Sequence, residues 1–446
     1  MLIRNVLVGS AVAVAGMALA PPEACAQGGP PARPYRALFG ADDMSRPAKH
    51  ELNLSLNFSG ALDNNAYATQ AAGPAEEGGE PDAGRSELYT GGAQLAYTLR
   101  DRKVAFNAIG SASYPYYSAL PEQADSPAFG GSVNVSYAER ASTFTASGSY
   151  RYSPYYTPML DAGYVPPAGG FDYSSALLAN EAVAGGAGVS RRFGRSTSAA
   201  VGYTVSGTRF EDDSRSDARQ SLRGSVTRQF GRNVSIGGGY AYARALYDAG
   251  AGAGADSVTY DSHGVDVNGG YAHRWSPSQS TSLSFGIGWS EVGYLDEPSS
   301  RWRGSAGVAH VFGPTWSVTA GYGRTLEYWS ATGEPTWTDS LTASLNGRFN
   351  SRVSASAGAA YYSGERVSGP GARFTSYSGS ANLQVAISRN LALFGGYVYY
   401  TYDYPASYDL PAGVPSVFDR QRVIGGATFW LPIVHAGRAR VDAGSR

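Results

Sequence analysis

The most constraining feature of this sequence is a two-residue alternation of apolar and polar side chains. It first appears at Leu52, Leu54, Leu56 and Phe58, which are separated by Asn53, Ser55 and Asn57. A period of two is that of a β-strand with one apolar and one polar face. The runs last about ten residues, whereas strands of soluble proteins average about five or six. About ten residues is the length of a tilted strand that crosses a membrane, so the pattern predicts membrane-spanning strands.

The same alternation recurs to the end of the chain, and two kinds of connection separate the runs. Short turn signals lie at 101–102, 139–140, 194–195, 231–232, 277–278, 313–314, 350–351 and 389–390. Longer irregular segments lie at about 60–86, 115–127, 153–176, 211–217, 247–260, 295–300, 331–336, 364–373 and 404–417. Short turns on one side and long loops on the other are typical of bacterial outer-membrane barrels. We therefore predict an all-β fold, a transmembrane antiparallel up-and-down β-barrel of about 18 strands.

Composition agrees with this fold class and excludes others. The chain has 58 Gly and 32 Tyr, only 16% charged residues, and a formal net charge of -1. A mean hydropathy of -0.25 is too low for a helical membrane protein, and no segment after the N-terminus has the roughly 20 apolar residues of a spanning helix. The near-zero net charge gives no field that would attract nucleic acid, so we expect no nucleic-acid partner.

The ends of the chain predict processing and export. Arg4 followed by an apolar stretch up to Ala20, then the small residues Ala24-Cys25-Ala26, has the form of a signal peptide over 1–26. Cys25 also allows the interpretation that the chain is a lipoprotein. Pro22 argues against this, because lipoprotein signals carry Leu at that position. We expect 27–48 to be a periplasmic lead-in, 49–434 the transmembrane barrel, and 435–446 a periplasmic tail. Cleavage after Ala26 would remove the only cysteine and with it any disulfide or thiolate chemistry.

Aromatic residues gather where the strands should meet the membrane surfaces. Many tyrosines lie near the long loops and predict an outer aromatic girdle, formed by Tyr114, Tyr150, Tyr152, Tyr240, Tyr242, Tyr322, Tyr361, Tyr362, Tyr399 and Tyr400. An inner girdle is predicted next to the short turns, from Phe193, Phe230, Trp275, Phe312, Trp316 and Phe349.

Charged residues in the strands fall mostly on the polar parity, which would face the lumen. We expect Arg219, Arg223, Arg303 and Arg422 to face the lumen, and Asp266 and Arg348 have the same inward parity. They could bias a pore toward anions, or they could pair with Asp or Glu across the wall. Arg244 and Arg324 have the outward parity, near the outer strand ends, where lipopolysaccharide phosphates are available. Charge is costly only near the middle of the lipid face.

The predicted outer loops carry tyrosines beside prolines. Flat aromatic rings on rigid loops suit stacking against sugars, and the candidates are Tyr116, Tyr117, Tyr155, Tyr156, Tyr404 and Tyr408. The alternative is that these rings extend the outer girdle.

Nothing in the sequence predicts an enzyme. The five histidines are scattered without metal-ligand spacing, and His263 and Asp266 should lie on opposite faces of their strand. We therefore expect no catalytic residue, no metal site and no cofactor.

The chain also resembles the porin-like outer-membrane barrels found with bacterial exopolysaccharide systems. The resemblance rests on Tyr35-Arg36-Ala37-Leu38-Phe39-Gly40, on the run ELNLSLNFSG at 51–60, and on Asp63-Asn64-Asn65, which also has the composition of a plain turn. It implies an outer-membrane pore in a Gram-negative bacterium that serves as the port for exopolysaccharide secretion. The implied partners are outer-membrane lipid and lipopolysaccharide, with polysaccharide and the periplasmic export machinery.

Two other functions remain open from the sequence. One is a structural or adhesion barrel with surface-binding loops and a closed lumen. The other is a general diffusion porin for small anionic solutes. A pore is favoured because barrels of 16–18 strands leave an aqueous channel.

Overall fold

The fold is a single sheet of 18 antiparallel strands, seen in a computed structural model. The residues described are 48–64, 86–118, 126–153, 179–210, 216–248, 257–294, 297–313, 315–329, 334–367, 373–405 and 416–438. The strands are β1 (Ala48–Asp63), β2 (Ser86–Arg100), β3 (Val104–Tyr117), β4 (Ala128–Glu139), β5 (Ser142–Ser153), β6 (Asn180–Phe193), β7 (Thr197–Phe210), β8 (Ser216–Phe230), β9 (Val234–Asp248), β10 (Val258–Ser276), β11 (Gln279–Tyr294), β12 (Glu297–Phe312), β13 (Trp316–Trp329), β14 (Glu334–Arg348), β15 (Val353–Arg366), β16 (Arg373–Ala386), β17 (Leu391–Asp403) and β18 (Val417–Arg438). Among these described residues, no helix is long and apolar enough to cross a membrane.

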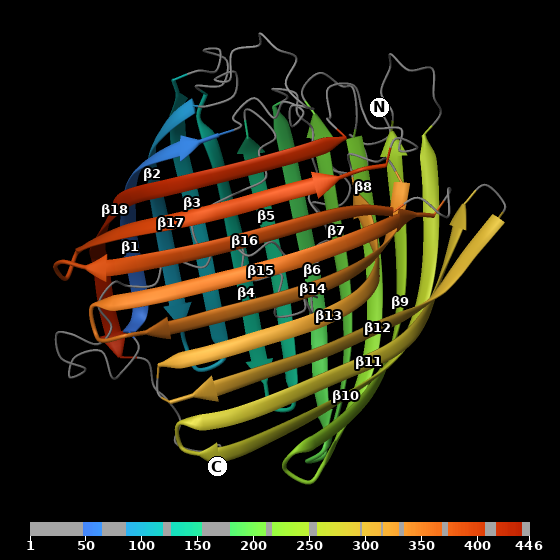
Figure 1. The fold of residues 1–446 in the computed structure, drawn as a ribbon. Helices are drawn as coiled ribbons and strands as arrows, with labels where there is room; N and C mark the ends of the chain where they lie inside the picture. The colour runs from blue at the N-terminus through green and yellow to red at the C-terminus, as the bar shows by residue number, and fades with distance from the viewer. Residues whose placement is uncertain are drawn as a thin grey trace, which may run out of the picture.

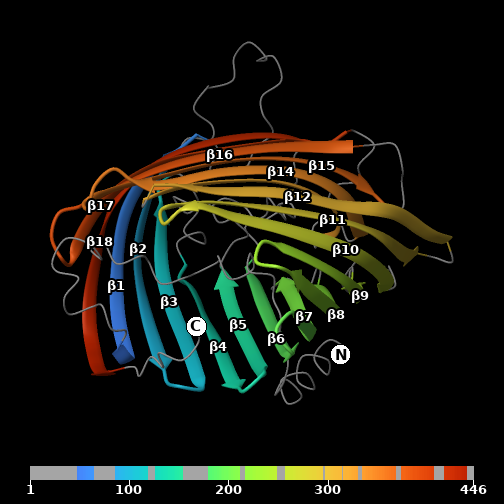
Figure 2. The same ribbon diagram turned by 90° about the horizontal axis from the view of Figure 1, so that it is seen from below.

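The sheet closes through its first and last strands. β1 pairs with β18 along its whole length, from Ala48 opposite Arg438 to Asp63 opposite Arg422. Figures 1 and 2 show the blue β1 beside the red β18 and the strands arranged as a ring. Closure gives the edge strands a partner, which matters because each unpaired backbone group in lipid costs several kcal/mol. The predicted barrel and its strand number are confirmed.

One irregularity interrupts this seam. The register shifts between Leu52 and Asn53, whose partners are Val434 and Pro432, so Ile433 is an extra residue in β18. Pro432 has no N–H to donate to the ladder, and a bulge is a position where a strand accepts proline.

The connections at one end of the barrel are short, and their positions are those predicted. Eight short turns join each even-numbered strand from β2 to β16 to the strand that follows it. Gly194, Gly231 and Gly313 have φ of 71°, 66° and 76°, the left-handed region in which glycine carries no Cβ penalty. We call this the periplasmic end, because short turns lie there in bacterial barrels.

At the other end, the strands are longer than the sequence predicted. Tyr116 and Tyr117 belong to β3, residues 297–300 belong to β12, and residues 334–336 belong to β14. The sequence therefore predicted too long an extent for the loops at 115–127, 295–300 and 331–336. Hairpin pairing continues past the apolar alternation, because above the membrane a ladder needs no apolar face.

Side-chain parity separates two surfaces. Val267, Phe285 and Ile287 are 57%, 61% and 59% exposed although they are apolar, because they point outward. Their strand neighbours Asn268 and Gly286 point inward, as the register of β10 with β11 requires. An exposed apolar belt around a closed sheet is the surface that lipid covers.

The ends of the barrel differ slightly from the prediction of 49–434. β1 begins at Ala48, and β18 continues to Arg438, so residues 435–438 are strand rather than tail. The predicted signal peptide and residues 27–47 of the lead-in lie outside the described residues.

The predicted inner girdle residues lie at the periplasmic strand ends with their rings outward. Phe193, Phe230, Trp275 and Phe349 are 53%, 48%, 66% and 64% exposed, and Phe312 is 38% exposed. Trp316 contacts Phe349 edge to face at 5.1 Å between ring centroids.

The outer tyrosines divide between the two surfaces. Tyr114, Tyr240 and Tyr322 point outward, as an outer girdle requires. Tyr362 and Tyr400 were assigned to the same girdle, but they face inward and are fully buried. Consecutive residues of a strand point to opposite faces. Only one tyrosine of the pair Tyr361–Tyr362, and only one of the pair Tyr399–Tyr400, can therefore face lipid.

Candidate functional site: the barrel lumen

Inward positions of the strands carry small and polar side chains. On β11 these are Ser282, Ser284, Gly286, Gly288 and Ser290, between outward Leu283, Phe285 and Ile287. Such side chains fill little of a barrel of this size, so space for water remains at its centre.

The outer end of the β13–β14 hairpin separates from β12 and bends into the lumen, while β14 stays paired with β15. The pairing of β12 with β13 begins with Phe312 opposite Trp316 and ends with Gly304 opposite Arg324. Beyond Arg324, β13 stays paired with β14 as far as Trp329 opposite Glu334, while β12 continues separately to Glu297. Figure 1 shows β12 and β13 side by side at the periplasmic end and separated at the other. We call the separated part, residues 325–329 and 334–338, the in-folded hairpin.

The in-folded hairpin is held by an apolar contact with the inner wall. Trp337 is 2% exposed and belongs to one buried cluster with Ala245, Tyr260 and Val292, which face inward from β9, β10 and β11. Leu326 packs on the same cluster. In a continuous wall, the parity of Trp337 would point it outward, so bending the hairpin converts an exposed indole into a buried one. Burying a side chain of this size stabilises the bend by about 2–3 kcal/mol.

Polar contacts hold the same hairpin across the barrel. The Tyr328 hydroxyl donates to Ser262 Oγ at 2.6 Å, and the Arg219 guanidinium lies 4.5 Å from the centre of the Tyr328 ring. Arg301 on β12 forms a two-pronged ion pair with Glu365 on β15, with N–O distances of 2.8 and 3.1 Å. Arg219 thus faces the lumen as predicted, at the point where the hairpin narrows it.

A second charged group lies deeper in the lumen. Asp266 lies between Arg223 and Arg303, with N–O distances of 3.3 and 3.5 Å. Two guanidinium groups share one carboxylate, so the group carries a net positive charge. Arg223 is the more exposed of the two, with 56% of its side chain accessible against 24% for Arg303.

Glycine makes the position of Arg303 possible. A Cβ at Gly264 would lie 2.9 Å from Arg303 Nη2, and one at Gly288 would lie 2.4 Å from the Val265 carbonyl oxygen. A larger residue at Gly264 would have to displace the Arg303 guanidinium or the Ser290 hydroxyl.

The periplasmic mouth carries arginines that parity also places inward. These are Arg100, Arg192, Arg274 and Arg348, on β2, β6, β10 and β14. All four are exposed, and none forms an ion pair with a carboxylate among the described residues. Arg348 was recognised from its parity. The other three were missed, although each directly adjoins an outward apolar residue such as Phe193 or Trp275.

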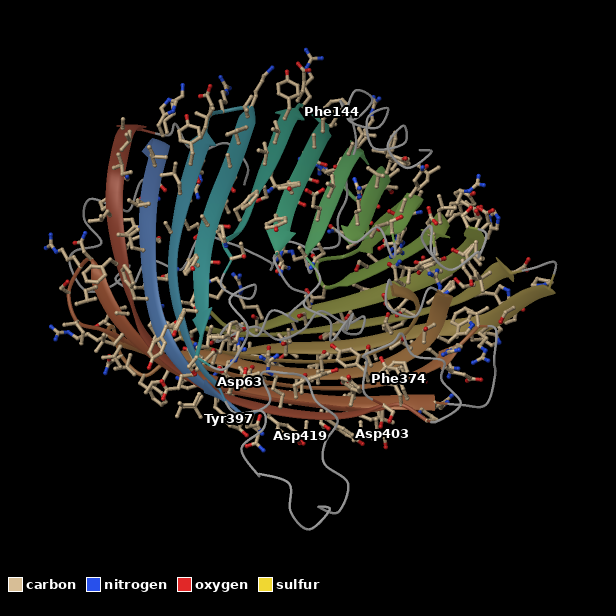
Figure 3. The ribbon with its side chains drawn as sticks, turned by 90° about the horizontal axis from the view of Figure 1, so that it is seen from above. Asp63, Phe144, Phe374, Tyr397, Asp403 and Asp419 are labelled. Carbon is tan, nitrogen blue, oxygen red and sulfur yellow. The ribbon has the colours of Figure 1, made fainter. Side chains whose placement is uncertain are left out.

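Arg422 faces inward as predicted, but it is not available to a solute. It is 7% exposed, and its Nη2 donates to Asp63 Oδ2 at 2.8 Å. Arg420 binds the same carboxylate, with Nε 3.0 Å from both oxygens. Asp63 is itself 2% exposed, and Figure 3 labels it on the inner side of the wall. This triad joins β1 to β18, so Arg422 has a structural contact at the seam instead of a role in the pore.

The predicted sugar-stacking tyrosines are not brought together. Tyr116 points outward from β3 and stacks on Tyr89, with 6.5 Å between ring centroids. Tyr117 is 3% exposed in a cluster with Leu88, and Tyr404 is 5% exposed against Phe374. Burial leaves Tyr117 and Tyr404 little surface for a sugar, whereas Tyr116 is 49% exposed and its stacking role stays a prediction. Tyr155, Tyr156 and Tyr408 lie outside the described residues.

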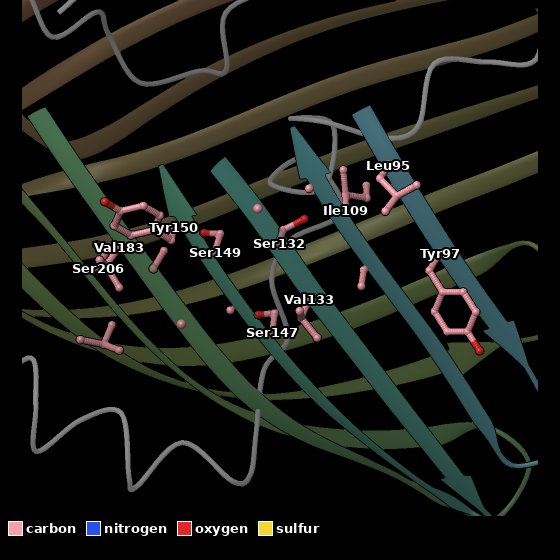
Figure 4. Close-up of a pocket in the computed structure, with 17 residues that line it drawn as sticks. Leu95, Tyr97, Ile109, Ser132, Val133, Ser147, Ser149, Tyr150, Val183 and Ser206 are labelled. Carbon is pink, nitrogen blue, oxygen red and sulfur yellow. The ribbon is translucent and has the colours of Figure 1, made fainter. Parts of the chain in front are cut away.

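A hollow of about 720 Å³ in the wall formed by β2–β7 is a separate feature. It forms where glycines meet across strands, Gly110 opposite Gly131 and Gly148 opposite Gly185. Figure 4 shows its flanks, which include Leu95 and Tyr150. These flanking side chains point outward, so the hollow faces lipid and is not part of the solute path.

Comparison with known proteins agrees with the architecture. A family described as the outer membrane protein beta-barrel domain matches residues 175–349. No curated protein sequence matches the chain significantly.

Several solved structures align with most of the chain at low sequence identity and with TM-scores below 0.5. They include OccAB2 of Acinetobacter baumannii, at 10% identity and a TM-score of 0.47, covering 86% of this chain and 98% of that one. OprD of Pseudomonas aeruginosa matches at 11% identity and 0.43, covering 89% and 96%. OccK2 (OpdF) of Pseudomonas aeruginosa, crystallised in complex with glucuronate, matches at 10% and 0.44, covering 87% and 100%. The closed sheet, its apolar belt and the family match lead to one conclusion: this chain is an antiparallel β-barrel of the Gram-negative outer membrane.

Proposed function

We propose that this protein is a passive pore for small anionic solutes. The observation that carries the proposal is the sequence of arginines along the lumen wall. Arg192 and its neighbours lie at the periplasmic mouth, Arg223 and Arg303 lie deeper, and Arg219 and Arg301 lie at the in-folded hairpin. Because a low-dielectric wall focuses the field of its charges, such a lumen concentrates anions and depletes cations.

The in-folded hairpin favours small solutes over a polymer. It occupies part of the outer half of the lumen and is anchored to the wall by Trp337 and Tyr328. The exopolysaccharide port implied by the sequence resemblance would need that segment displaced to pass a chain. None of the similar proteins found supports such a cargo. Loss of surface polysaccharide on deletion of the gene would favour the export port over the diffusion pore.

Reversal potentials test the proposal. The purified barrel is inserted into a planar bilayer between unequal KCl concentrations, and the voltage of zero current is measured. We expect this reversal potential to have the sign that indicates a higher permeability for chloride than for potassium. A cation-selective or unselective pore contradicts the proposal, and a bilayer without conductance favours the adhesion barrel with a closed lumen.

A further inference from the structure

Two neighbouring periplasmic hairpins repeat one short sequence. Residues 191–195 and 228–232 both read Arg-x-Phe-Gly-Arg, at the β6–β7 and β8–β9 turns. Their glycines, Gly194 and Gly231, share the left-handed backbone with φ of 71° and 66°. The two turns therefore present the same residues in the same way.

The first arginine and the phenylalanine of each repeat point toward lipid. Phe193 and Phe230 are 53% and 48% exposed on the outer face. Arg191 and Arg228 are on the same parity, with guanidinium carbons 5.6 and 5.4 Å from the centres of those rings.

The two repeats form one surface. Phe193 is opposite Thr197 on β7, and Thr197 is opposite Arg228 on β8. Phe193 and Arg228 are therefore two strand spacings apart in one row, or about 10 Å. We call this surface the basic–aromatic patch, formed by Arg191, Phe193, Arg195, Arg228, Phe230 and Arg232.

The positive charge of the patch is not neutralised within the described part of the chain. The sequence has no Asp or Glu between Glu181 and Glu211, or between Asp217 and Asp248. None of the four patch arginines has an ion pair among the described residues. Nearby Lys103 differs, because its ammonium lies 3.3 Å from Glu139.

The next two hairpins along the chain do not carry this paired charge. β10 and β12 end in the same arrangement, but with His273 beside Trp275 and His310 beside Phe312. An imidazole in place of a guanidinium carries no fixed charge. The patch thus concentrates four fixed positive charges on one arc of the barrel, at the level of the inner aromatic girdle.

We propose that the basic–aromatic patch binds the phosphate headgroup of an anionic phospholipid, such as phosphatidylglycerol, in the inner leaflet of the outer membrane. The guanidinium groups supply paired N–H donors to the phosphate oxygens. The exposed rings of Phe193 and Phe230 pack beside the glycerol and ester region, the depth that interfacial aromatics prefer. This site is independent of the lumen and of what passes through it.

Lipid titration of the full barrel tests the proposal. The protein in neutral detergent is titrated with dioleoyl phosphatidylglycerol or dioleoyl phosphatidylcholine, and bound lipid is counted by native mass spectrometry. We expect tighter binding of phosphatidylglycerol. Each arginine near a membrane surface contributes about fivefold in affinity, so the R191Q/R228Q variant should bind it about 25-fold more weakly.

Arg192 provides the matched control, because it is adjacent in sequence and has the same charge but faces the lumen. R192Q should bind phosphatidylglycerol as the unchanged protein does, while its reversal potential shifts. R191Q/R228Q should show the opposite pattern, which separates failure of this proposal from failure of the anion-pore proposal. Unchanged lipid binding in R191Q/R228Q, or an equal loss in R192Q, overturns the proposal. If the double variant does not fold, the single variants R191Q and R228Q should each lose about fivefold.

Discussion

Replacing Asp63 by Asn should destabilise the barrel strongly, although it changes a single functional group. Asp63, Arg420 and Arg422 are 2%, 3% and 7% exposed, and both guanidinium groups donate to this carboxylate. The amide of Asn carries no charge, so two buried cations lose the counter-ion that they share. Breaking a buried ion pair by removing one partner costs about 3–5 kcal/mol, and we expect a loss of that size in the free energy of unfolding.

Urea unfolding in phospholipid vesicles, followed by tryptophan fluorescence, measures this loss. Asp419→Asn is the matched control on the same part of the barrel. Asp419 points outward, as Figure 3 shows, and accepts a hydrogen bond from the Tyr399 hydroxyl at 3.0 Å. The control should lose about 1 kcal/mol or less. Equal losses in the two variants would refute the argument, because the seam would then draw no particular stability from its buried triad.

Three further predictions concern the lumen and the lipid face. Asp266→Asn removes the carboxylate shared by two arginines, so the reversal potential should move further toward chloride, whereas Arg303→Gln should move it toward potassium. Val267→Arg places a charge on the lipid face and should lower the free energy of unfolding by about 2–4 kcal/mol in the same urea titration. Asn268→Arg, at the next residue, faces the lumen and should lower that free energy only slightly. Trp337→Ala removes the ring that anchors the in-folded hairpin, so single-channel recordings should show a larger and noisier conductance than the unchanged protein; an unchanged conductance would mean that the hairpin does not narrow the path.

The wall of the barrel was predictable because one physical requirement acts on every strand. Lipid outside and water inside impose the two-residue period, visible where Leu283, Phe285 and Ile287 alternate with Ser284 and Gly286. Turn residues such as Gly194 then mark where each hairpin reverses, and eight of eight short turns were found in this way.

The contacts inside the barrel were not predictable in the same way. The Asp63 carboxylate and Arg420 are 357 residues apart in sequence, and only closure of the barrel brings them together. Asp63 therefore had the signal of an ordinary turn residue. Parity placed Arg422 in the lumen correctly, but parity does not reveal whether an inward charge is already paired.

The in-folded hairpin gave no sequence signal either. Thr336, Trp337 and Thr338 alternate as a wall strand does, and nothing local distinguishes them from β11. The burial of Trp337 depends on contacts with Tyr260 and Val292 on other strands, which a local pattern cannot report.

Single-channel conductance of the purified protein in a planar bilayer tests the central claim most directly. A closed barrel with a water-filled, arginine-lined lumen should give stable open steps and carry chloride in preference to potassium. The absence of such steps from folded, inserted protein, or steps that prefer potassium, would contradict the account of the lumen given above.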